Sequence, residues 1–282
     1  MSFRPYAHLG LMIILLLAAS LPAHAEETAF LRVEKSKTIN CGYITWPPYI
    51  IKDPNTGKVS GINYDIMEAI GRNLGLKINW IVETGSGEIA AALNAQKFDV
   101  MCASLWPAAG RLQTLTMTRA TFYNPVHAFT RADDQRFDSN IEKANIKDVK
   151  ISAIDGDYSY DLAKEKLPNA TIVSLPMTAS GSEFLMQIMT KKADIVMCDV
   201  GLVNDFMKTN PNTLRKVASI PPVRIYGELL SVRRGEYQLR DMIDHAITQL
   251  ADDGVIETIL QKYEKNYGVK YYSPTPSYVV PR

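Results

Sequence analysis

The chain has 282 residues, of which 46% are hydrophobic, and its 31 basic and 30 acidic residues leave a formal net charge of +1. This length is enough for two compact lobes of ordinary size. A balanced charge without a basic stripe argues against nucleic acid as a partner.

The first 25 residues have the pattern of a signal peptide. Arg4 lies in a short leader, and residues 9–21 form an almost wholly apolar run. Ala23 and Ala25 offer small side chains at the −3 and −1 positions of a cleavage site. A retained membrane anchor is the alternative, but the run is shorter than the roughly 20 residues that span a bilayer as a helix. No cysteine stands directly after the run, so a lipid anchor at this site is unsupported. We therefore expect a cleaved leader, no lipid anchor and a periplasmic protein.

Strand-like and helix-like segments alternate along the rest of the chain, which indicates an α/β fold with mostly parallel sheets. We predict strands at 38–44, 77–82, 98–103, 151–154, 171–175 and 194–198. We predict helices at 88–95, 161–166, 183–190 and 240–263, the last interrupted at 252–254. The tail after Gly268 is rich in Tyr, Pro and Ser, and we expect it to pack as an extended strap or to be mobile.

The segment 44–76 is the most informative part of the chain. Its Trp-Pro-Pro-Tyr stretch at 46–49 predicts a rigid turn, because each proline fixes its own φ and restricts the residue before it. The sequence at 53–57, Asp-Pro-Asn-Thr-Gly, predicts a hairpin turn. An amphipathic helix follows, which we expect Asn63 to cap. Its buried face is predicted to carry Met67, Ile70 and Leu74.

This block resembles the opening of the family 3 (amino-acid-type) periplasmic solute-binding proteins of bacterial ABC importers. Those proteins have an aromatic-x-Pro-aromatic turn, a short hairpin and a Gly-Phe-Asp-x-Asp helix start, which here reads Gly-Ile-Asn-Tyr-Asp at 61–65. The resemblance continues through segments 97–111, 147–160, 191–203 and 236–267.

The resemblance implies a two-lobe, type II periplasmic-binding-protein-like fold. Each lobe would be a mostly parallel sheet flanked by helices, and the chain would cross between the lobes twice. The signal peptide would be 1–25, lobe 1 would comprise 26–125 and 224–282, and lobe 2 would be 126–223.

Arg111 is the first candidate for ligand binding. A planar guanidinium grips a carboxylate with two parallel hydrogen bonds, which lysine cannot copy. From the residues alone, a solvated surface arginine is the simpler interpretation. The resemblance places Arg111, after the Trp-Pro-Ala-Ala-Gly stretch at 106–110, where the family binds the ligand carboxylate. Ser104, at the end of the preceding strand, can add a hydroxyl or backbone contact.

Asp199 is the second candidate. It ends an apolar strand, where a charged side chain needs a reason. Ligands of open α/β sheets bind beyond the carboxyl ends of the strands, and the family uses this aspartate to receive the α-ammonium of the ligand. The alternative is an N-cap for the following segment 200–207, and the two roles are compatible.

Aromatic residues are expected to give the pocket its character. By resemblance, Trp46 is the wall that stacks on the ligand side chain. Trp106 stands where a serine or threonine is usual, and Tyr158 replaces another usual threonine, so Ser159 is a candidate for the missing hydroxyl. As a set, these residues suggest a ligand with a flat or apolar side chain, or a cation held over ring faces.

Three cysteines, Cys41, Cys102 and Cys198, lie in strand-like apolar runs. We favour small buried hydrophobes for all three. A Cys41–Cys102 disulfide is the alternative, since the two predicted strands are expected to be adjacent and the compartment is oxidising.

The predicted function is a monomeric periplasmic protein that captures a small amino-acid-like ligand and presents it to an inner-membrane ABC permease. The histidines after residue 25, His127 and His245, lack zinc-site spacing, and we see no nucleotide or nucleophile motif, so we expect no metal or cofactor. One alternative is an enzyme like the cyclohexadienyl dehydratases on the same scaffold, with Asp157 or Glu88 as the acid. Another is a ligand sensor that docks on a separate signalling partner.

Overall fold

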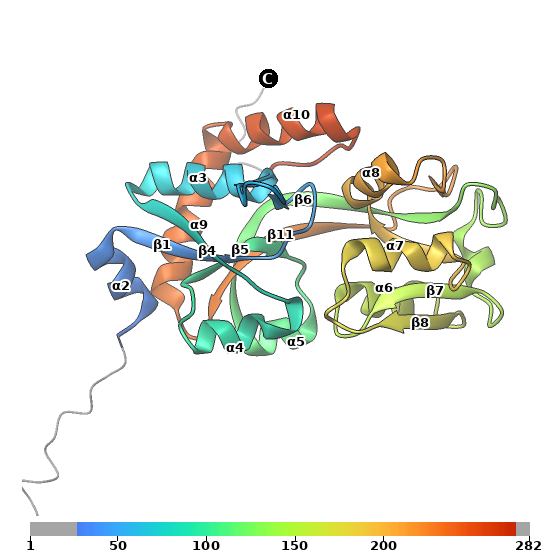
Figure 1. Cartoon of the computed structure of the whole chain (residues 1–282), viewed down its shortest axis with the longest axis horizontal. Coiled ribbons are helices and arrows are strands. Elements are labelled where there is room, and N and C mark those ends of the chain that lie inside the picture. Colours follow the sequence, from blue (N-terminus) through green and yellow to red (C-terminus); the bar gives the residue numbers. More distant parts are fainter. Residues whose placement is uncertain (1–26, 275–282) are drawn as a thin grey trace, which may run out of the picture.

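The computed structural model describes residues 27–274, so the predicted signal peptide and the last residues of the tail lie outside the described part. Figure 1 shows two lobes joined by β6 (Leu115–Arg131) and β11 (Arg224–Arg233), which run from one lobe to the other. These long strands are the two crossovers expected of the fold. The predicted lobe boundaries stay predictions: residues 125 and 126 lie within β6, and residue 224 is the first of β11.

One 9-stranded sheet passes through both lobes in the order β4-β1-β5-β11-β6-β9-β7-β8, with β10 (Leu214–Lys216) paired to β6. In the first lobe the parallel strands are β1 (Thr38–Tyr43), β4 (Lys77–Glu83) and β5 (Val100–Leu105). In the second they are β7 (Lys150–Ile154), β8 (Thr171–Leu175) and β9 (Ile195–Asp199). The crossing strands β6 and β11 pair antiparallel with each other. The carboxyl ends of β5 and β9 therefore point toward the junction of the lobes.

Helices cover both faces of the sheet (Figure 1). Lobe 1 carries α2 (Ala29–Ser36), α3 (Ile62–Leu74), α4 (Ile89–Asn94), α5 (Ala109–Thr114), α9 (Tyr237–Asp252) and α10 (Val255–Tyr267). Lobe 2 carries α6 (Tyr158–Lys166), α7 (Gly181–Met189) and α8 (Val200–Thr209). Short 3-10 turns, η1 (Ser86–Glu88) and η2 (Ile141–Ala144), and the hairpin strands β2 (Ile51–Lys52) and β3 (Val59–Ser60) complete the fold. None of the helices in residues 27–274 is long and apolar enough to cross a membrane.

The start of α3 differs from the prediction, because Gly61 and not Asn63 is the N-cap residue. Gly61 has a φ of 123°, and a Cβ at this position would lie 2.4 Å from the carbonyl oxygen of Tyr49. Only glycine tolerates both conditions. Asn63 lies inside the first turn, where its buried side chain donates to Ser104 instead of capping the helix.

Cys41 and Cys102 form a disulfide, with their Cα atoms 5.5 Å apart, while Cys198 is a buried free thiol. The favoured prediction of three buried hydrophobes is therefore wrong for this pair. The physical reason is the parallel pairing of β1 with β5, in which Cys41 lies opposite Val100 and so close to Cys102.

The two lobes are in close contact on the side of α8. A Cβ on Gly201 of α8 would lie 2.8 Å from the Pro48 ring and 2.8 Å from the Tyr271 hydroxyl oxygen. Tyr271 is fully buried, and its neighbour Tyr272 pairs with Tyr123, so the tail up to residue 274 packs as an extended strap. Lobe 2 thus rests directly on the proline turn and on this strap.

The disulfide yields a prediction for stability. Replacing Cys41 and Cys102 together by alanine should lower the free energy of unfolding by about 2–4 kcal/mol, because the cross-link restricts the unfolded chain. Denaturant unfolding with and without a reductant measures the loss. Reductant should destabilise the native protein and leave the double variant unchanged; equal stability of reduced and oxidised native protein would contradict the prediction.

Candidate functional site

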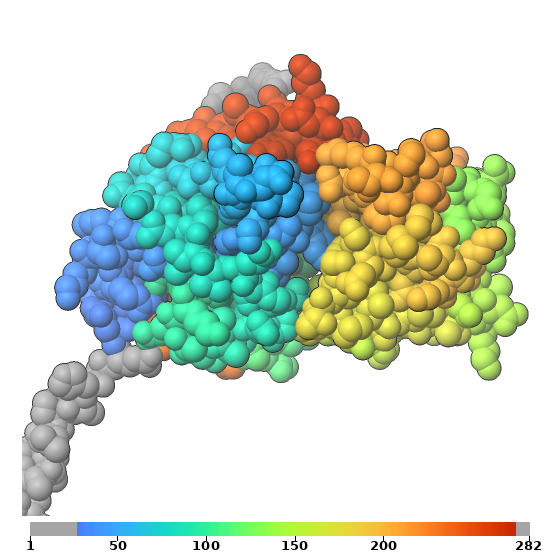
Figure 2. Space-filling model, in the orientation of Figure 1, coloured from blue at the N-terminus to red at the C-terminus, as the bar shows by residue number. Residues whose placement is uncertain are grey.

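A cavity of about 730 Å³, counting its open mouth, lies between the lobes. This volume is within the usual range of small-molecule sites. Figure 2 shows the narrow seam along which the lobes meet. The cavity is lined by Ile44, Trp46, Tyr49, Asn63, Ser86, Ala103, Ser104, Leu105, Trp106, Arg111, Ile154, Asp157, Ser159, Phe184, Cys198, Asp199 and Glu228. Of the seven predicted binding residues, the cavity brings together six and leaves out Tyr158.

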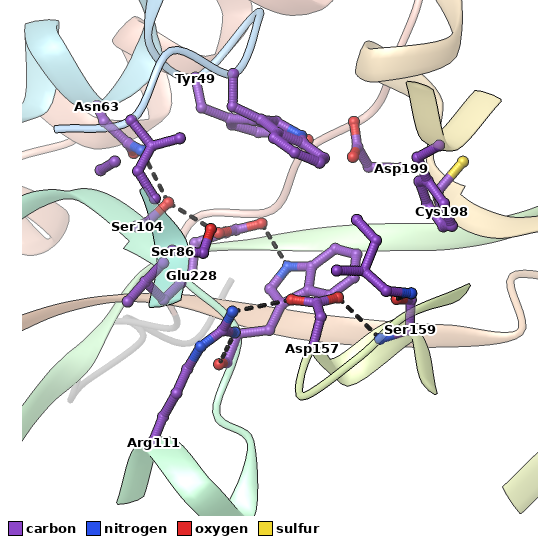
Figure 3. Close-up of a pocket in the computed structure, with 17 residues that line it drawn as sticks. Tyr49, Asn63, Ser86, Ser104, Arg111, Asp157, Ser159, Cys198, Asp199 and Glu228 are labelled. Carbon is purple, nitrogen blue, oxygen red and sulfur yellow. Dashed lines mark hydrogen bonds and ion pairs between the residues drawn. The ribbon is translucent and has the colours of Figure 1, made fainter. Parts of the chain in front are cut away.

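Arg111 is held at the cavity by two hydrogen bonds, drawn in Figure 3. It lies in α5, and its Nη1 donates to the Trp106 carbonyl oxygen at 3.0 Å. Its Nη2 donates to Oδ2 of Asp157 at 2.9 Å, an ion pair that links the two lobes. Asp157 is itself the N-cap of α6 and accepts from the Ser159 amide. The guanidinium is therefore oriented but already partly neutralised.

Asp199 is both at the cavity and at a helix cap. Its Oδ1 accepts from the Leu202 amide at 2.7 Å as the N-cap of α8, and the residue is 2% exposed. Burial raises the pKa of this carboxyl to about 6, although the Leu202 amide and the Tyr49 and Trp46 side chains counter part of that effect. The structure thus allows both of the roles weighed for this residue.

Glu228 of β11 also lines the cavity, and it was not among the predicted residues. Its carboxylate accepts from the Ser104 hydroxyl at 2.8 Å, from the Trp106 indole nitrogen at 2.6 Å and from Nδ2 of Asn124 at 3.2 Å. Nδ2 of Asn63 in turn donates to the Ser104 hydroxyl at 2.9 Å. Burial raises the pKa of Glu228 to about 7, and the charge of Asp199 adds to the rise.

The Glu228 network explains two residues that depart from the resemblance. Trp106 occupies a usual serine or threonine position, and its indole nitrogen donates to Glu228. Asn63 replaces an acid at the helix start, and its amide reaches Ser104. The sequence did contain a signal for Glu228, since it is a lone acid within an otherwise apolar stretch of β11.

The aromatic residues fall into two groups. Trp46 and Tyr49 line the cavity, and Trp46 packs against hydrophobic clusters of both lobes. Tyr158 lies behind the cavity, where its ring packs 4.2 Å from the Tyr226 ring and 6.4 Å from the Trp106 ring, centroid to centroid. Tyr158 therefore supports Trp106 instead of lining the cavity as expected.

Ser159 lines the cavity, and its hydroxyl oxygen accepts from the Ile154 amide at 3.1 Å. Its hydroxyl proton remains available for a ligand.

The two acids considered for a dehydratase differ in position. Asp157 lines the cavity and is paired with Arg111, whereas Glu88 is exposed and does not line the cavity.

The raised pKa values predict how stability changes with pH. Folding raises the pKa of Asp199 from 3.8 to about 6 and the pKa of Glu228 from 4.5 to about 7. At a pH between the unfolded and folded values, the folded state therefore binds more protons than the unfolded state. The free energy of unfolding from these two groups therefore falls as pH rises through this window.

The side chain of the Glu228→Gln variant cannot ionise. Between pH 4.5 and 7.5 the free energy of unfolding of this variant should therefore fall less than that of the native protein, and the difference should be up to about 3 kcal/mol. Urea unfolding across this range measures the difference. Glu34→Gln, at an exposed position of α2, is the matched control and should follow the native curve. Parallel curves for the Glu228 variant and the native protein would refute the assignment.

Comparisons with known proteins agree with this architecture. The sequence model of the bacterial extracellular solute-binding proteins, family 3, matches residues 39–266. A probable amino-acid ABC transporter-binding protein of Haemophilus influenzae is 28% identical over 203 residues, covering 72% of this chain and 75% of that protein. The L-cystine-binding protein TcyA of Bacillus subtilis is 23% identical over 221 residues, covering 78% of each.

Among solved structures, the ancestral amino acid-binding protein AncCDT-1, described as a precursor of cyclohexadienyl dehydratase, superimposes with a TM-score of 0.69. It is 20% identical, and the match covers 84% of this chain and 99% of that one. This likeness shows the fold, a type II periplasmic-binding-protein architecture. With the family match extending over most of its length, the chain belongs to the family 3 bacterial extracellular solute-binding proteins.

Proposed function

We propose that this protein captures a small amino-acid-like ligand between its lobes, as a monomer in the periplasm, and delivers it to an ABC-type permease of the inner membrane. The observation that carries the proposal is the single cavity that receives a guanidinium, Arg111, from one lobe and a buried carboxyl, Asp199, from the other. A molecule with a carboxylate and an ammonium group is complementary to both. The names of the relatives, an amino-acid ABC transporter-binding protein and an L-cystine-binding protein, support it.

In the proposed complex, Arg111 binds the ligand carboxylate and Asp199 the α-ammonium. Arg111 has five N–H donors, and its contacts with Trp106 and Asp157 use only some of them. The ligand carboxylate shares this guanidinium with Asp157. Trp46 forms a wall for the side chain, and Ser104 and Ser159 offer hydroxyl groups at the same cavity.

A ligand held in this way couples binding to lobe closure. Because its two charged groups are bound by opposite lobes, both contacts exist only when the lobes are together. Such a ligand favours the closed state by its differential affinity for that state. The closed protein is then the form that a permease distinguishes from the empty one. Delivery to a permease is preferred to docking on a signalling partner because the Haemophilus influenzae relative is named an amino-acid ABC transporter-binding protein.

The charges at the cavity favour binding over the dehydratase alternative. A dicarboxylate substrate would meet the buried carboxyls Asp199 and Glu228, with a single guanidinium that is already paired. Placing further negative charge beside buried carboxyls is costly. Incubation with prephenate or arogenate, followed by ultraviolet absorbance of the product, tests the alternative directly.

Arg111→Ala should weaken the binding of any amino acid that the native protein binds by about 30-fold or more, because it removes a charge-assisted contact with the carboxylate. A thermal-shift screen over amino acids identifies a ligand, and isothermal titration calorimetry gives its affinity. Arg72→Ala, at an exposed position of α3, is the control and should bind normally. Unchanged calorimetric affinity in the Arg111 variant would contradict the proposal that Arg111 binds the ligand carboxylate.

A further inference from the structure

The cavity has one more negative charge than an ordinary amino acid can match. Four charged side chains line it: Arg111, Asp157, Asp199 and Glu228. Arg111 and Asp157 pair with each other. A zwitterion adds one cation, placed at Asp199, and one carboxylate, placed at Arg111. Glu228 then remains without a counter-charge.

No lysine, arginine or histidine in residues 27–274 forms an ion pair with Glu228. Its three hydrogen-bond donors are the uncharged side chains of Ser104, Trp106 and Asn124. A carboxylate offers about four acceptor positions, so one of them is still available. Glu228 is 4% exposed, and bulk water is a poor source of the missing partner.

A second acceptor lies on Asn63, another residue that lines the cavity. Asn63 uses its amide nitrogen on Ser104, and its Oδ1 is buried without a hydrogen-bond partner among the described residues. A buried acceptor of this kind is costly unless a donor reaches it. Asn63 and Glu228 are both hydrogen-bonded to Ser104 (Figure 3), so a donor-rich group bound beside Ser104 would lie near both acceptors.

We propose that Glu228 and Asn63 form a second cation subsite, so that the ligand is a basic amino acid with a guanidinium or ammonium at the end of its side chain. This inference rests on the proposed function, which places the α-ammonium and carboxylate at Asp199 and Arg111. The Trp46 and Tyr49 rings that line the cavity are compatible with a cation over their faces.

The subsite exchanges one proton for the ligand cation. When the side-chain cation enters, Glu228 gives up its proton to solvent and stays ionised in the complex. The other titratable groups that face Glu228 are Asp199, Tyr49 and Tyr271, from β9, the proline turn and the tail strap. Burial raises the pKa of both tyrosines above their usual value, so near neutral pH only Asp199 titrates beside Glu228.

Calorimetry with two matched pairs of probes separates the subsites. L-arginine and L-citrulline have nearly the same shape but differ in side-chain charge, and L-norleucine is L-lysine without its terminal ammonium. All four carry the same α-ammonium and carboxylate, so the ratio of affinities within a pair cancels the contribution of Asp199. Each pair is titrated at pH 5.5 and 8.5, and again at pH 7 in two buffers of different ionisation enthalpy.

We expect at least one basic probe to bind about tenfold or more tighter than its neutral partner at pH 8.5. That preference should fall at pH 5.5 by up to about thirtyfold, the change in the ionised fraction of a carboxyl of pKa about 7. At pH 7 the basic probe should release about half a proton more than the neutral one. Glu228→Gln should abolish the preference and its pH dependence, and Glu34→Gln should preserve both.

Any different result overturns the inference of a second cation subsite, and the results can be told apart. Equal affinities within both pairs, or binding of the neutral probes alone, would eliminate the second subsite and leave the proposed function intact. A preference that persists in Glu228→Gln would place the cation elsewhere in the cavity. Failure of all amino acids to bind would remove the proposed function and this inference together. The proton count uses the native protein, so it decides the question even if the variant does not fold.

Discussion

Two buried carboxyl groups, Asp199 and Glu228, form no ion pair with any residue in the described range 27–274, and the proposed ligand site is built around them. Desolvation disfavours their ionised forms and raises the pKa of Asp199 to about 6 and of Glu228 to about 7. The fold tolerates them because each accepts hydrogen bonds from fixed donors, the Leu202 amide for Asp199 and three side chains for Glu228. Their burial costs free energy of folding, and a cationic ligand in the cavity would offset that cost.

The supporting structure serves to bring these groups together from distant parts of the chain. Asp199 ends β9 in the second lobe, and Glu228 lies on β11, the strand that returns to the first. Close packing at Gly201 and the Arg111–Asp157 ion pair hold the lobes against each other around them. A Cβ at Gly201 would lie 2.8 Å from the Pro48 ring and from the Tyr271 hydroxyl oxygen, so a larger residue there would force α8 or its neighbours to shift. With the lobes held in this way, Asp199 is 2% and Glu228 4% exposed.

The sequence predicted most of the framework because the framework depends on local patterns. The amino-acid sequence alone shows the alternating strands and helices and the break near Gly254 between α9 and α10. It also shows the candidates Arg111 and Asp199 at the ends of their predicted segments. Glu228 was missed because its significance arises only from tertiary contacts. In the sequence, Glu228 is only a lone acid between apolar neighbours of β11; its role appears when Ser104, Trp106 and Asn124 are brought around it. Asn63 was misplaced for a related reason, since the contact between Gly61 and Tyr49 sets where α3 begins.

The departures from the family pattern are better explained together than one at a time. A tryptophan at 106 removes a hydroxyl that could bind a ligand amine, and alone it would only narrow the cleft. With Glu228 in place, its indole nitrogen instead orients a carboxylate, and Asn63 orients Ser104 toward the same group. Tyr158 then acts through its packing with Tyr226 and Trp106, which fixes the indole in that position. The hydrogen bonds around Glu228 thus account for the residues at 63 and 106, and Tyr158 supports Trp106 by packing. In the proposed complex, ligand choice then depends on β11, the strand that joins the lobes, as well as on the aromatic wall at Trp46.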